Sequence, residues 1–233
     1  HKQRGLLFAG TERGLYVSSD DGESWQSMQL NLPIVPLTDL AIKEDDLIAS
    51  TQGRGYWILD DIGILRQLSS ETLADDHRLF SPSVSYRLSS GYVENPTHMG
   101  QNPPAGVRLR YWLSHGLTAD DEFSLKIYDA DDNLIRDYTT LPEKVVGQSD
   151  DYKAWGEDPR LLKAEAGLND FVWDLSYPAA GRFKGLVLWN DDLDGPKAVP
   201  GEYSAELTVN EWKQRVRFEV RADPRLSITQ EEY

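Results

Sequence analysis

Residues 18–25, Ser-Ser-Asp-Asp-Gly-Glu-Ser-Trp, follow the pattern S-x-D-x-G-x-x-W, and the segment that carries them recurs once in the chain. Leu7-Phe8-Ala9 returns as Leu47-Ile48-Ala49, and the pair Asp20-Asp21 returns as Asp60-Asp61. The offset between the two copies is 40 residues (47 − 7). A repeat of this length is typical of one four-stranded blade of a β-propeller, so we expect blades at the start of the chain.

The strands expected in the two copies are short and separated by Gly and Asp, as closely spaced hairpins require. Tyr16 of the first copy matches Tyr56 of the second at the same offset. The first copy has three expected strands and the second has four: Leu6–Thr11, Leu15–Ser19 and Trp25–Leu30, then Thr38–Lys43, Leu47–Thr51, Tyr56–Leu59 and Ile64–Leu68. Two explanations stay open for the three-stranded copy. Either the N-terminus interrupts a blade, or the N-terminal strand completes the last blade of a ring.

The remaining sequence predicts a connector followed by a second all-β domain. Several proline-containing segments interrupt residues 69–106, where proline removes backbone donors and fixes φ. Alternating apolar strands are then expected at Val107–Leu113, Phe123–Tyr128, Leu134–Tyr138, Asp170–Leu175, Ser204–Val209 and Arg215–Val220. Such strands predict a sandwich of the immunoglobulin or fibronectin-III kind. The expected division is propeller blades at 1–68, a proline-rich connector at 69–106, the sandwich at 107–224 and a C-terminal tail at 225–233.

The composition limits the classes of partner. The chain has 233 residues, a net charge of −15 and no cysteine. Such an acidic chain repels the phosphates of nucleic acid, and no apolar run reaches the roughly 18–20 residues that a membrane helix needs. The lack of cysteine excludes disulfides and thiolate metal sites. We therefore expect neither a nucleic-acid partner nor a membrane-spanning segment.

Four stretches carry a family resemblance. Residues 18–25 and Thr51-Gln52-Gly53-Arg54-Gly55-Tyr56-Trp57, together with the 40-residue repeat, resemble the Asp-box propellers, also called bacterial neuraminidase repeat proteins. This sortilin-like group is often labelled glycosyl hydrolase. Residues 167–175 and Pro200-Gly201-Glu202-Tyr203 resemble a signature of fibronectin-III-like domains appended to such exported proteins. The resemblance implies an all-β fold, with terminal propeller blades before an immunoglobulin-like or fibronectin-III-like sandwich, in a secreted or periplasmic bacterial protein.

The Asp box has a structural interpretation. Asp20 is expected to accept hydrogen bonds from turn amides, Gly22 to adopt a positive φ, Ser18 to add a local hydrogen bond and Trp25 to fold beneath the turn. We assign no catalytic residue to this chain. Arg54 lies in a Gly-flanked turn and is the expected ligand contact, with pairing to neighbouring acids as the alternative.

Other acidic groups give weaker signals. Asp60 and Asp61 are adjacent on a strand, so their side chains point to opposite faces and do not form a glycosidase pair. Asn190, Asp192 and Asp194 match the opening ligands of an EF-hand loop, but the twelfth position is Gly201 instead of Glu. These three residues are calcium candidates, and no other cofactor is expected. Trp155, Trp189 and Trp212 are candidates for a sugar-stacking platform, and packing within the insertions is the alternative for Trp155 and Trp189.

Two functions follow from the resemblance. The first is a non-catalytic C-terminal module with a structural or binding role toward a glycan, peptide or protein. The second is part of a glycoside hydrolase whose catalytic residues lie mostly outside this chain. Two blades leave open sheet edges, so we expect the missing N-terminal blades or another copy of the chain to pack on Leu6–Thr11 or Thr38–Lys43.

Overall fold

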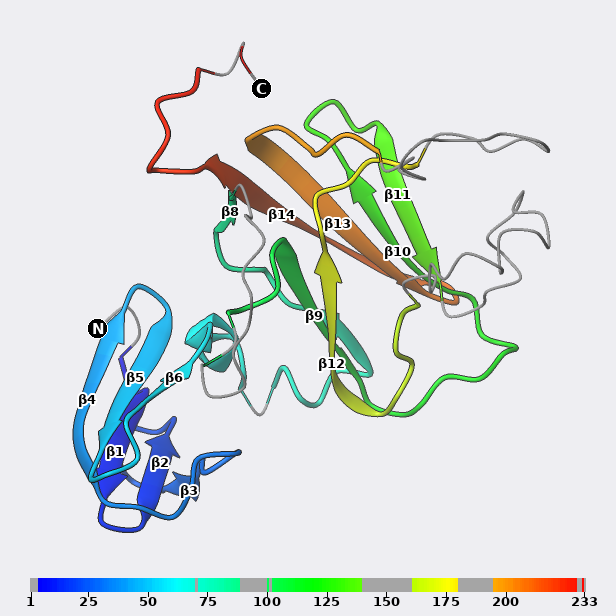
Figure 1. The fold of residues 1–233 in the computed structure, drawn as a ribbon. Helices are drawn as coiled ribbons and strands as arrows, with labels where there is room; N and C mark the ends of the chain where they lie inside the picture. Colours follow the sequence, from blue (N-terminus) through cyan, green and yellow to red (C-terminus); the bar gives the residue numbers. More distant parts are fainter. Residues whose placement is uncertain are drawn as a thin grey trace, which may run out of the picture. The chain divides into compact units, whose positions relative to one another are not determined.

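The computed structural model describes residues 4–69, 71–88, 100, 102–139, 161–179, 195–229 and 232. The described part is all-β, as expected, with short antiparallel sheets, one 3-10 helix and no α-helix (Figure 1). No helix in these residues is long and apolar enough to cross a membrane. The chain forms two compact units, His1–Ser69 and Ser70–Tyr233, and each is described separately below.

The first unit contains two three-stranded antiparallel sheets. The strands of the first sheet are β1 (Leu7–Thr11), β2 (Gly14–Ser18) and β3 (Gln26–Ser27). Those of the second are β4 (Leu37–Lys43), β5 (Asp46–Thr51) and β6 (Tyr56–Leu59). In both sheets the strands follow one another in chain order, as a succession of tight hairpins requires.

The pairing registers show how the two sheets correspond. Ala9 pairs with Tyr16 in the first sheet, and Ala49 pairs with Trp57 in the second. The alanines are 40 residues apart, but their partners are 41 apart (57 − 16), because the second hairpin has one residue more. The expected match of Tyr16 with Tyr56 is therefore wrong by one position. Trp57 is the structural counterpart of Tyr16, and Tyr56 that of Leu15.

The core of the first unit lies between these sheets. Phe8 and Leu15 of the first sheet share an apolar cluster with Leu47 of the second. Gly10 permits close contact, because a Cβ at this position would lie 3.0 Å from the Cβ of Leu37. One face of each sheet is thus buried against the other.

The opposite face of the second sheet is exposed. Ala41, Ile48 and Ile58 lie side by side across β4, β5 and β6, and Tyr56 lies on the same face as Ile58. Tyr56 is 80% exposed and Ile58 is 59% exposed. We call Ala41, Ile48, Tyr56 and Ile58 the open face.

Two expected strands of the first unit differ from the structure. The strand expected at Trp25–Leu30 shrinks to Gln26–Ser27, because the Gln29 side chain bonds the carbonyls of Leu32 and Pro33 in a turn. The strand expected at Ile64–Leu68 is instead η1, a 3-10 helix at Ile62–Arg66. Asp61 caps this helix through the amide of Gly63, and Ile62 is buried in the core.

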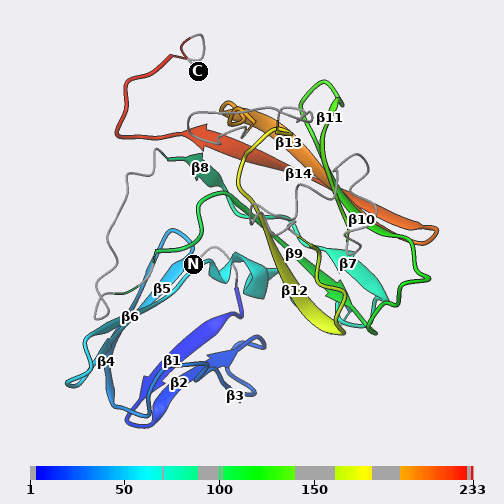
Figure 2. The same cartoon turned by 45° about the vertical axis from the view of Figure 1, so that its right-hand side comes forward.

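The second unit has two sheets. In one, β12 (Gly167–Trp173), β9 (Val107–Leu113) and β7 (His77–Leu79) lie in that order. In the other, the order is β11 (Leu134–Thr139), β10 (Phe123–Tyr128), β13 (Gly201–Val209), β14 (Trp212–Ala222) and β8 (Ser85–Arg87). This five-stranded sheet is curled, and Figure 2 shows the two sheets as separate layers. All pairs are antiparallel except β8 with β14.

The core of the second unit is formed by alternate residues of both layers. Along β9 and β10 every second side chain is buried, which the apolar alternation predicts. Trp173 of β12 is fully buried and meets Tyr203 and Phe218 of the other sheet edge-on. The aromatic contacts therefore link the two layers.

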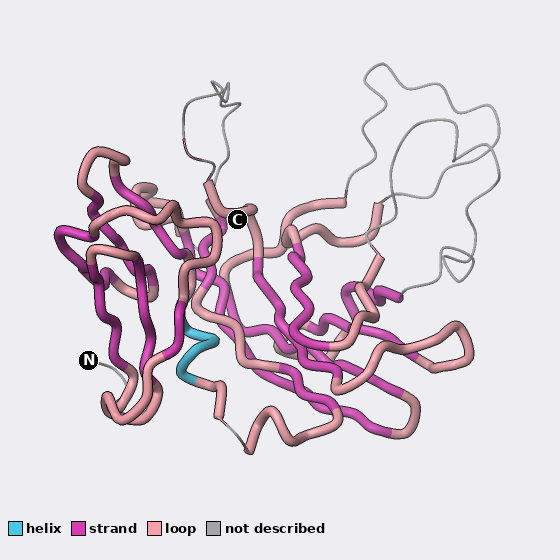
Figure 3. The backbone as a smooth tube through the Cα atoms, turned by 90° about the horizontal axis from the view of Figure 1, so that it is seen from below, coloured by secondary structure: helices cyan, strands magenta, loops and turns pink. Residues whose placement is uncertain are grey.

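Residues expected in the connector contribute two strands to this unit, β7 and β8, which are labelled in Figure 2. Figure 3 shows that strands, coloured magenta, make up much of the described backbone. Leu79 is 1% exposed, and its amide donates to the Gln214 side chain of β14 at 2.8 Å. Pro82 lies between β7 and β8, where no ladder hydrogen bond is needed. Pro82 therefore separates two short strands instead of preventing them.

Candidate functional site

The turn at residues 18–25 is held by its own polar groups. Asp20 Oδ1 accepts hydrogen bonds from the Ser24 amide at 2.9 Å and the Ser18 hydroxyl at 2.7 Å. Its Oδ2 accepts from the Ser24 hydroxyl. These bonds, with the Ser24 hydroxyl contributing most, lower the pKa of Asp20 to about 2. An ionised carboxylate with these donors around it is suited to stabilising a turn and unsuited to donating a proton.

Gly22 and Trp25 complete this turn. Gly22 has a φ of 94°, and its amide donates to the Ser18 hydroxyl at 2.9 Å. The Trp25 indole donates to the Gly22 carbonyl at 3.1 Å, and its ring lies beside Gly22. The ring remains 43% exposed, so it covers the turn from one side without being buried.

The second repeat has a different turn at the corresponding position. The Asp61 amide donates to the Asp46 carboxylate at 2.9 Å, and the Asp61 side chain accepts from the Gly63 amide at 3.2 Å. The Ile62 amide bonds the Asp45 carbonyl at 2.6 Å, as the Asp21 amide bonds the Gly5 carbonyl at 3.0 Å in the first repeat. The backbone connection is thus kept in both repeats, while the Asp-box side chains occur only in the first.

Arg54 lies in the hairpin turn between β5 and β6. The Thr51 hydroxyl donates to the Gly55 carbonyl at 2.7 Å and accepts from the Arg54 amide at 3.1 Å. The Trp57 indole donates to the Arg54 carbonyl at 3.1 Å. Gly53 and Gly55 have positive φ values of 84° and 72°, which glycine adopts without strain. Together these contacts fix the backbone of Arg54 without using its side chain.

The first repeat has the same turn chemistry. The Thr11 hydroxyl donates to the Gly14 carbonyl at 3.1 Å and accepts from the Arg13 amide at 3.1 Å. Arg13 and Arg54 are both exposed, and within the described residues neither guanidinium has a hydrogen bond or ion pair. Each repeat therefore presents one arginine from a rigid turn. The sequence singled out Arg54 but not its correspondence with Arg13. The spacing from the threonine to the glycine is three residues in the first turn and four in the second, so a search at a fixed spacing does not match the two arginines.

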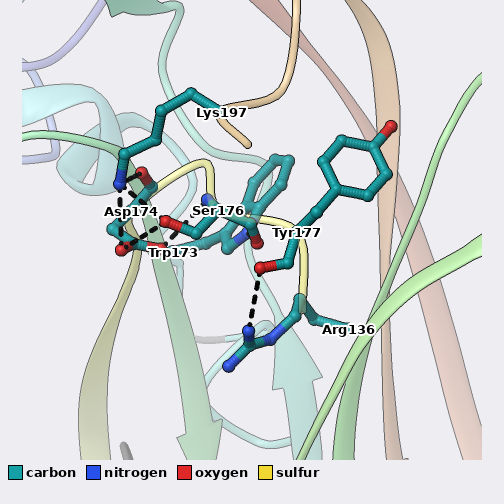
Figure 4. A network of polar contacts seen from close by, with 6 residues as sticks. All are labelled: Arg136, Trp173, Asp174, Ser176, Tyr177 and Lys197. Carbon is teal, nitrogen blue, oxygen red and sulfur yellow. Dashed lines mark hydrogen bonds and ion pairs between the residues drawn. The ribbon is translucent and has the colours of Figure 1, made fainter. Parts of the chain in front are cut away.

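The second unit contains a polar network that the sequence did not predict. Lys197 Nζ donates to the Ser176 hydroxyl at 2.6 Å and to the Asp174 carboxylate at 3.2 Å (Figure 4). The Ser176 hydroxyl in turn donates to Asp174 Oδ2 at 2.8 Å. Asp174 and Lys197 are separated by 23 positions, so no local pattern reveals the network.

This network has the residue types of a Ser–Lys catalytic pair, but the hydrogen bond between lysine and serine runs in the wrong direction for activating the serine. A lysine that activates serine accepts the hydroxyl proton, whereas here the ammonium donates to Ser176 and is paired with Asp174. Ser176 is also buried. The Ser176–Lys197 backbone bridge and the bond from the Ala198 amide to the Leu175 carbonyl at 2.6 Å join the same two segments. The network is a structural clamp.

The two described histidines of the second unit, His77 and His115, form no metal or catalytic site with other described residues. The rings of His77 and His115 are 5.6 Å apart, and His77 meets Trp212 edge-on at 5.5 Å. The Ser114 hydroxyl bonds both His115 Nδ1 at 3.0 Å and the Asp76 carboxylate at 3.4 Å, so serine and acid do not flank the imidazole. Among the described residues no three His, Asp or Glu side chains are grouped to hold a metal ion.

The remaining predicted site residues fall outside the described residues. These are the calcium candidates Asn190, Asp192 and Asp194, together with Trp155 and Trp189. The calcium and sugar-stacking hypotheses therefore stay predictions. Comparison of the chain with protein-family models, curated proteins and solved structures gives no match.

Proposed function

We propose that this chain is a non-catalytic structural and binding module of an exported bacterial protein. It consists of two blades of an Asp-box propeller followed by an immunoglobulin-like or fibronectin-III-like sandwich. Further blades, or another copy of the chain, are its structural partners. The binding role belongs to the arginine-bearing turns of the blades.

The repeated hairpins support the propeller part of this proposal. In both sheets of the first unit the strands follow chain order, and their registers match apart from one extra residue in the second hairpin. In both hairpins a threonine hydroxyl bonds a glycine carbonyl across a turn that contains an arginine. The open face also supports the proposal that the first unit is part of a propeller. The blades of a propeller pack on both faces, so an exposed apolar face on the second sheet is where a further blade would pack.

The strand order of the second unit supports the sandwich. The orders β7-β9-β12 and β11-β10-β13-β14 correspond to strands A-B-E and C′-C-F-G of an immunoglobulin-like fold. The hydroxyl of Tyr203, near the start of β13, donates to the Val199 carbonyl at 2.6 Å, which resembles the tyrosine corner of such domains. The inter-sheet disulfide of antibody domains has no counterpart, since the chain lacks cysteine.

The observation that carries the binding role is the side chain of Arg54. Its backbone is fixed by Thr51 and Trp57, its guanidinium has no partner among the described residues, and the neighbouring Tyr56 is 80% exposed. An exposed guanidinium without a partner can bind an anionic group through charge-assisted hydrogen bonds, and the exposed ring of Tyr56 offers a stacking surface. The proposed ligand therefore carries a carboxylate or a similar anion.

Titration of the chain with two probes, oligogalacturonate and a short poly-glutamate peptide, tests this role. We expect Arg54→Ala to weaken binding of the preferred probe by about 10–100-fold, because a charge-assisted contact contributes about 1.5–3 kcal/mol. Arg54→Lys should keep part of the affinity. Arg217→Ala, a change at an exposed arginine of β14, is the matched control and should bind as the unmodified chain does. Binding of neither probe, or equal binding by the Arg54→Ala variant, contradicts the proposal.

A further inference from the structure

The turns that carry Arg13 and Arg54 lie at the same end of the first unit. Gly10 comes just before the first turn, and a Cβ on Gly10 would lie 3.0 Å from the Cβ of Leu37. Leu37 in turn pairs with Thr51, where the second turn begins. Sheets packed face to face lie about 10 Å apart. The two arginine-bearing turns are therefore neighbours, separated by about one sheet spacing.

One segment, Gln29–Pro36, runs from the first of these turns to the second. At its start the Gln29 side chain lies against Gly14 of the first turn, where a Cβ would clash with it. At its end the Pro36 carbonyl accepts a hydrogen bond from the Gln52 amide of the second turn at 2.9 Å. We call Gln29–Pro36 the bridging segment, because it lies between the two arginines.

The bridging segment exposes apolar side chains. Ile34 is 82% exposed, the highest value of any large apolar side chain in the described residues, and Leu30 is 69% exposed. Leu32 of the same segment is buried in the core of the unit, and Val35 is buried as well, so the backbone that carries Ile34 is anchored. The described surface thus has an exposed apolar group between two guanidiniums.

A peptide matches this pattern better than a uronate chain does, because a uronate chain has carboxylates but no apolar side chain. An extended peptide advances about 3.3 Å per residue and places every second side chain on one side. Residues i, i+2 and i+4 then lie on one side over about 13 Å. Acidic residues at i and i+4 can reach the two arginines, while an apolar residue at i+2 contacts Ile34.

We propose that Arg13, Ile34 and Arg54 form a binding surface for an extended segment of a partner protein with the pattern acidic-x-apolar-x-acidic. The two carboxylates pair with the two guanidiniums through charge-assisted hydrogen bonds, and contact with Ile34 removes the central apolar residue from water. The inference rests on the proposed function, and it adds Arg13, Ile34 and the class of ligand.

NMR titration with the peptide Ser-Glu-Ser-Leu-Ser-Glu-Ser tests this surface. We expect Arg13→Ala and Arg54→Ala each to weaken binding by about 10-fold, because each removes one charge-assisted contact. Ile34→Ser should weaken it by about 3–10-fold through the lost apolar contact. Leu134→Ser, at an exposed leucine of the second unit, is the matched control and should bind as the unmodified chain does. The spectrum of each free variant checks that its fold is retained.

The ionic strength is kept at about 0.15 M, where the Debye length of about 8 Å screens the net charge of −15 but not the contacting pairs. A second peptide, with glutamine in place of one glutamate, separates binding by two arginines from binding by one. It should bind the unmodified chain about 10-fold more weakly than the first peptide, for the same loss of one charge-assisted contact. To the Arg13→Ala variant the two peptides should bind with similar affinity.

The outcomes separate this inference from the proposed function. No binding of the first peptide, an affinity unchanged by Arg13→Ala or by Ile34→Ser, or tighter binding of oligogalacturonate than of the peptide overturns the inference. The proposed function survives each of these results as long as Arg54→Ala weakens binding of an anionic probe. If Arg54→Ala weakens binding of no probe, the proposed function fails as well.

Discussion

Leu15 and Tyr56 occupy the same position of the repeat, yet Leu15 is 5% exposed and Tyr56 is 80% exposed. Leu15 pairs with Gly10 in the first sheet as Tyr56 pairs with Ser50 in the second. The first sheet has this face covered by the second sheet, whereas the second sheet has no cover on it among the described residues. The difference in exposure between Leu15 and Tyr56 therefore shows that the equivalent face is buried in the first repeat and exposed in the second.

The contrast predicts unequal effects of truncation at these two positions. Leu15→Ala should lower the free energy of unfolding of the first unit by about 2–5 kcal/mol, because it leaves a cavity in the core. Tyr56→Ala should change it by no more than about 0.5 kcal/mol, as for other exposed residues. Urea denaturation monitored by tryptophan fluorescence measures both. Equal losses would show that Tyr56 is buried in solution.

The turn at Asp20 predicts an acid transition. The pKa of Asp20 is lowered to about 2 from 3.8, so its contribution to folding is present above pH 3.8 and is lost as the pH falls through 2. NMR titration of the side-chain carbon should give this value directly. Ser24→Ala should raise the pKa, because the Ser24 hydroxyl is the largest cause of the shift. A titration of Asp20 near 3.8 in the unmodified chain contradicts the hydrogen-bonded turn.

The sequence predicts those features that depend on local patterns. Alternation along Val107–Leu113 predicts its buried and exposed sides, and the residues around Asp20 predict a tight turn. Features that depend on distant contacts are missed. Ile64 belongs to a 3-10 helix because Asp61 caps it and the core buries Ile62, and no alternation reports this. Lys197 reaches Ser176 across a long insertion, so the clamp has no sequence signature.

The close packing at Gly10 leaves no room for a larger side chain between the two sheets of the first unit. A Cβ there would lie 3.0 Å from Leu37 Cβ, so Gly10→Val should cost about 1–3 kcal/mol through overpacking. Gly201→Val is the matched control, because Gly201 also lies in a strand and has no atom within 4 Å of a built Cβ. Thermal denaturation compares the two variants. A neutral Gly10→Val would mean that the sheets separate easily.

Gly195, close in sequence to Lys197 of the clamp formed by Asp174, Ser176 and Lys197, also has no room for a side chain. A Cβ on Gly195 would lie 2.2 Å from the Tyr177 carbonyl oxygen, which requires the backbone to move. Gly195→Ala should therefore lower the melting temperature of the second unit by several degrees, since a loss of about 1 kcal/mol shifts it by about 2–4 °C in a domain of this size. Gly116→Ala, where the nearest atom is 3.5 Å away, should leave it unchanged. Equal melting temperatures for the two variants would show that the clamp tolerates displacement.

Tyr203 gives the last prediction. Its hydroxyl donates to the Val199 carbonyl at 2.6 Å, and burial, the largest cause, raises its pKa to about 12 from 10.0. Tyr203→Phe leaves that carbonyl without its donor, so the free energy of unfolding should fall by about 1–3 kcal/mol at neutral pH. The raised pKa means that Tyr203 stabilises the fold below pH 10 and that this contribution is lost as the pH rises through 12. Stability measured between these two pH values should therefore decline less in the Tyr203→Phe variant than in the unmodified chain. Tyr16→Phe, in the other unit, should keep the original decline. If Tyr203→Phe also keeps it, the hydroxyl is ionised as readily in the folded as in the unfolded chain, and the bond to Val199 does not hold the start of β13.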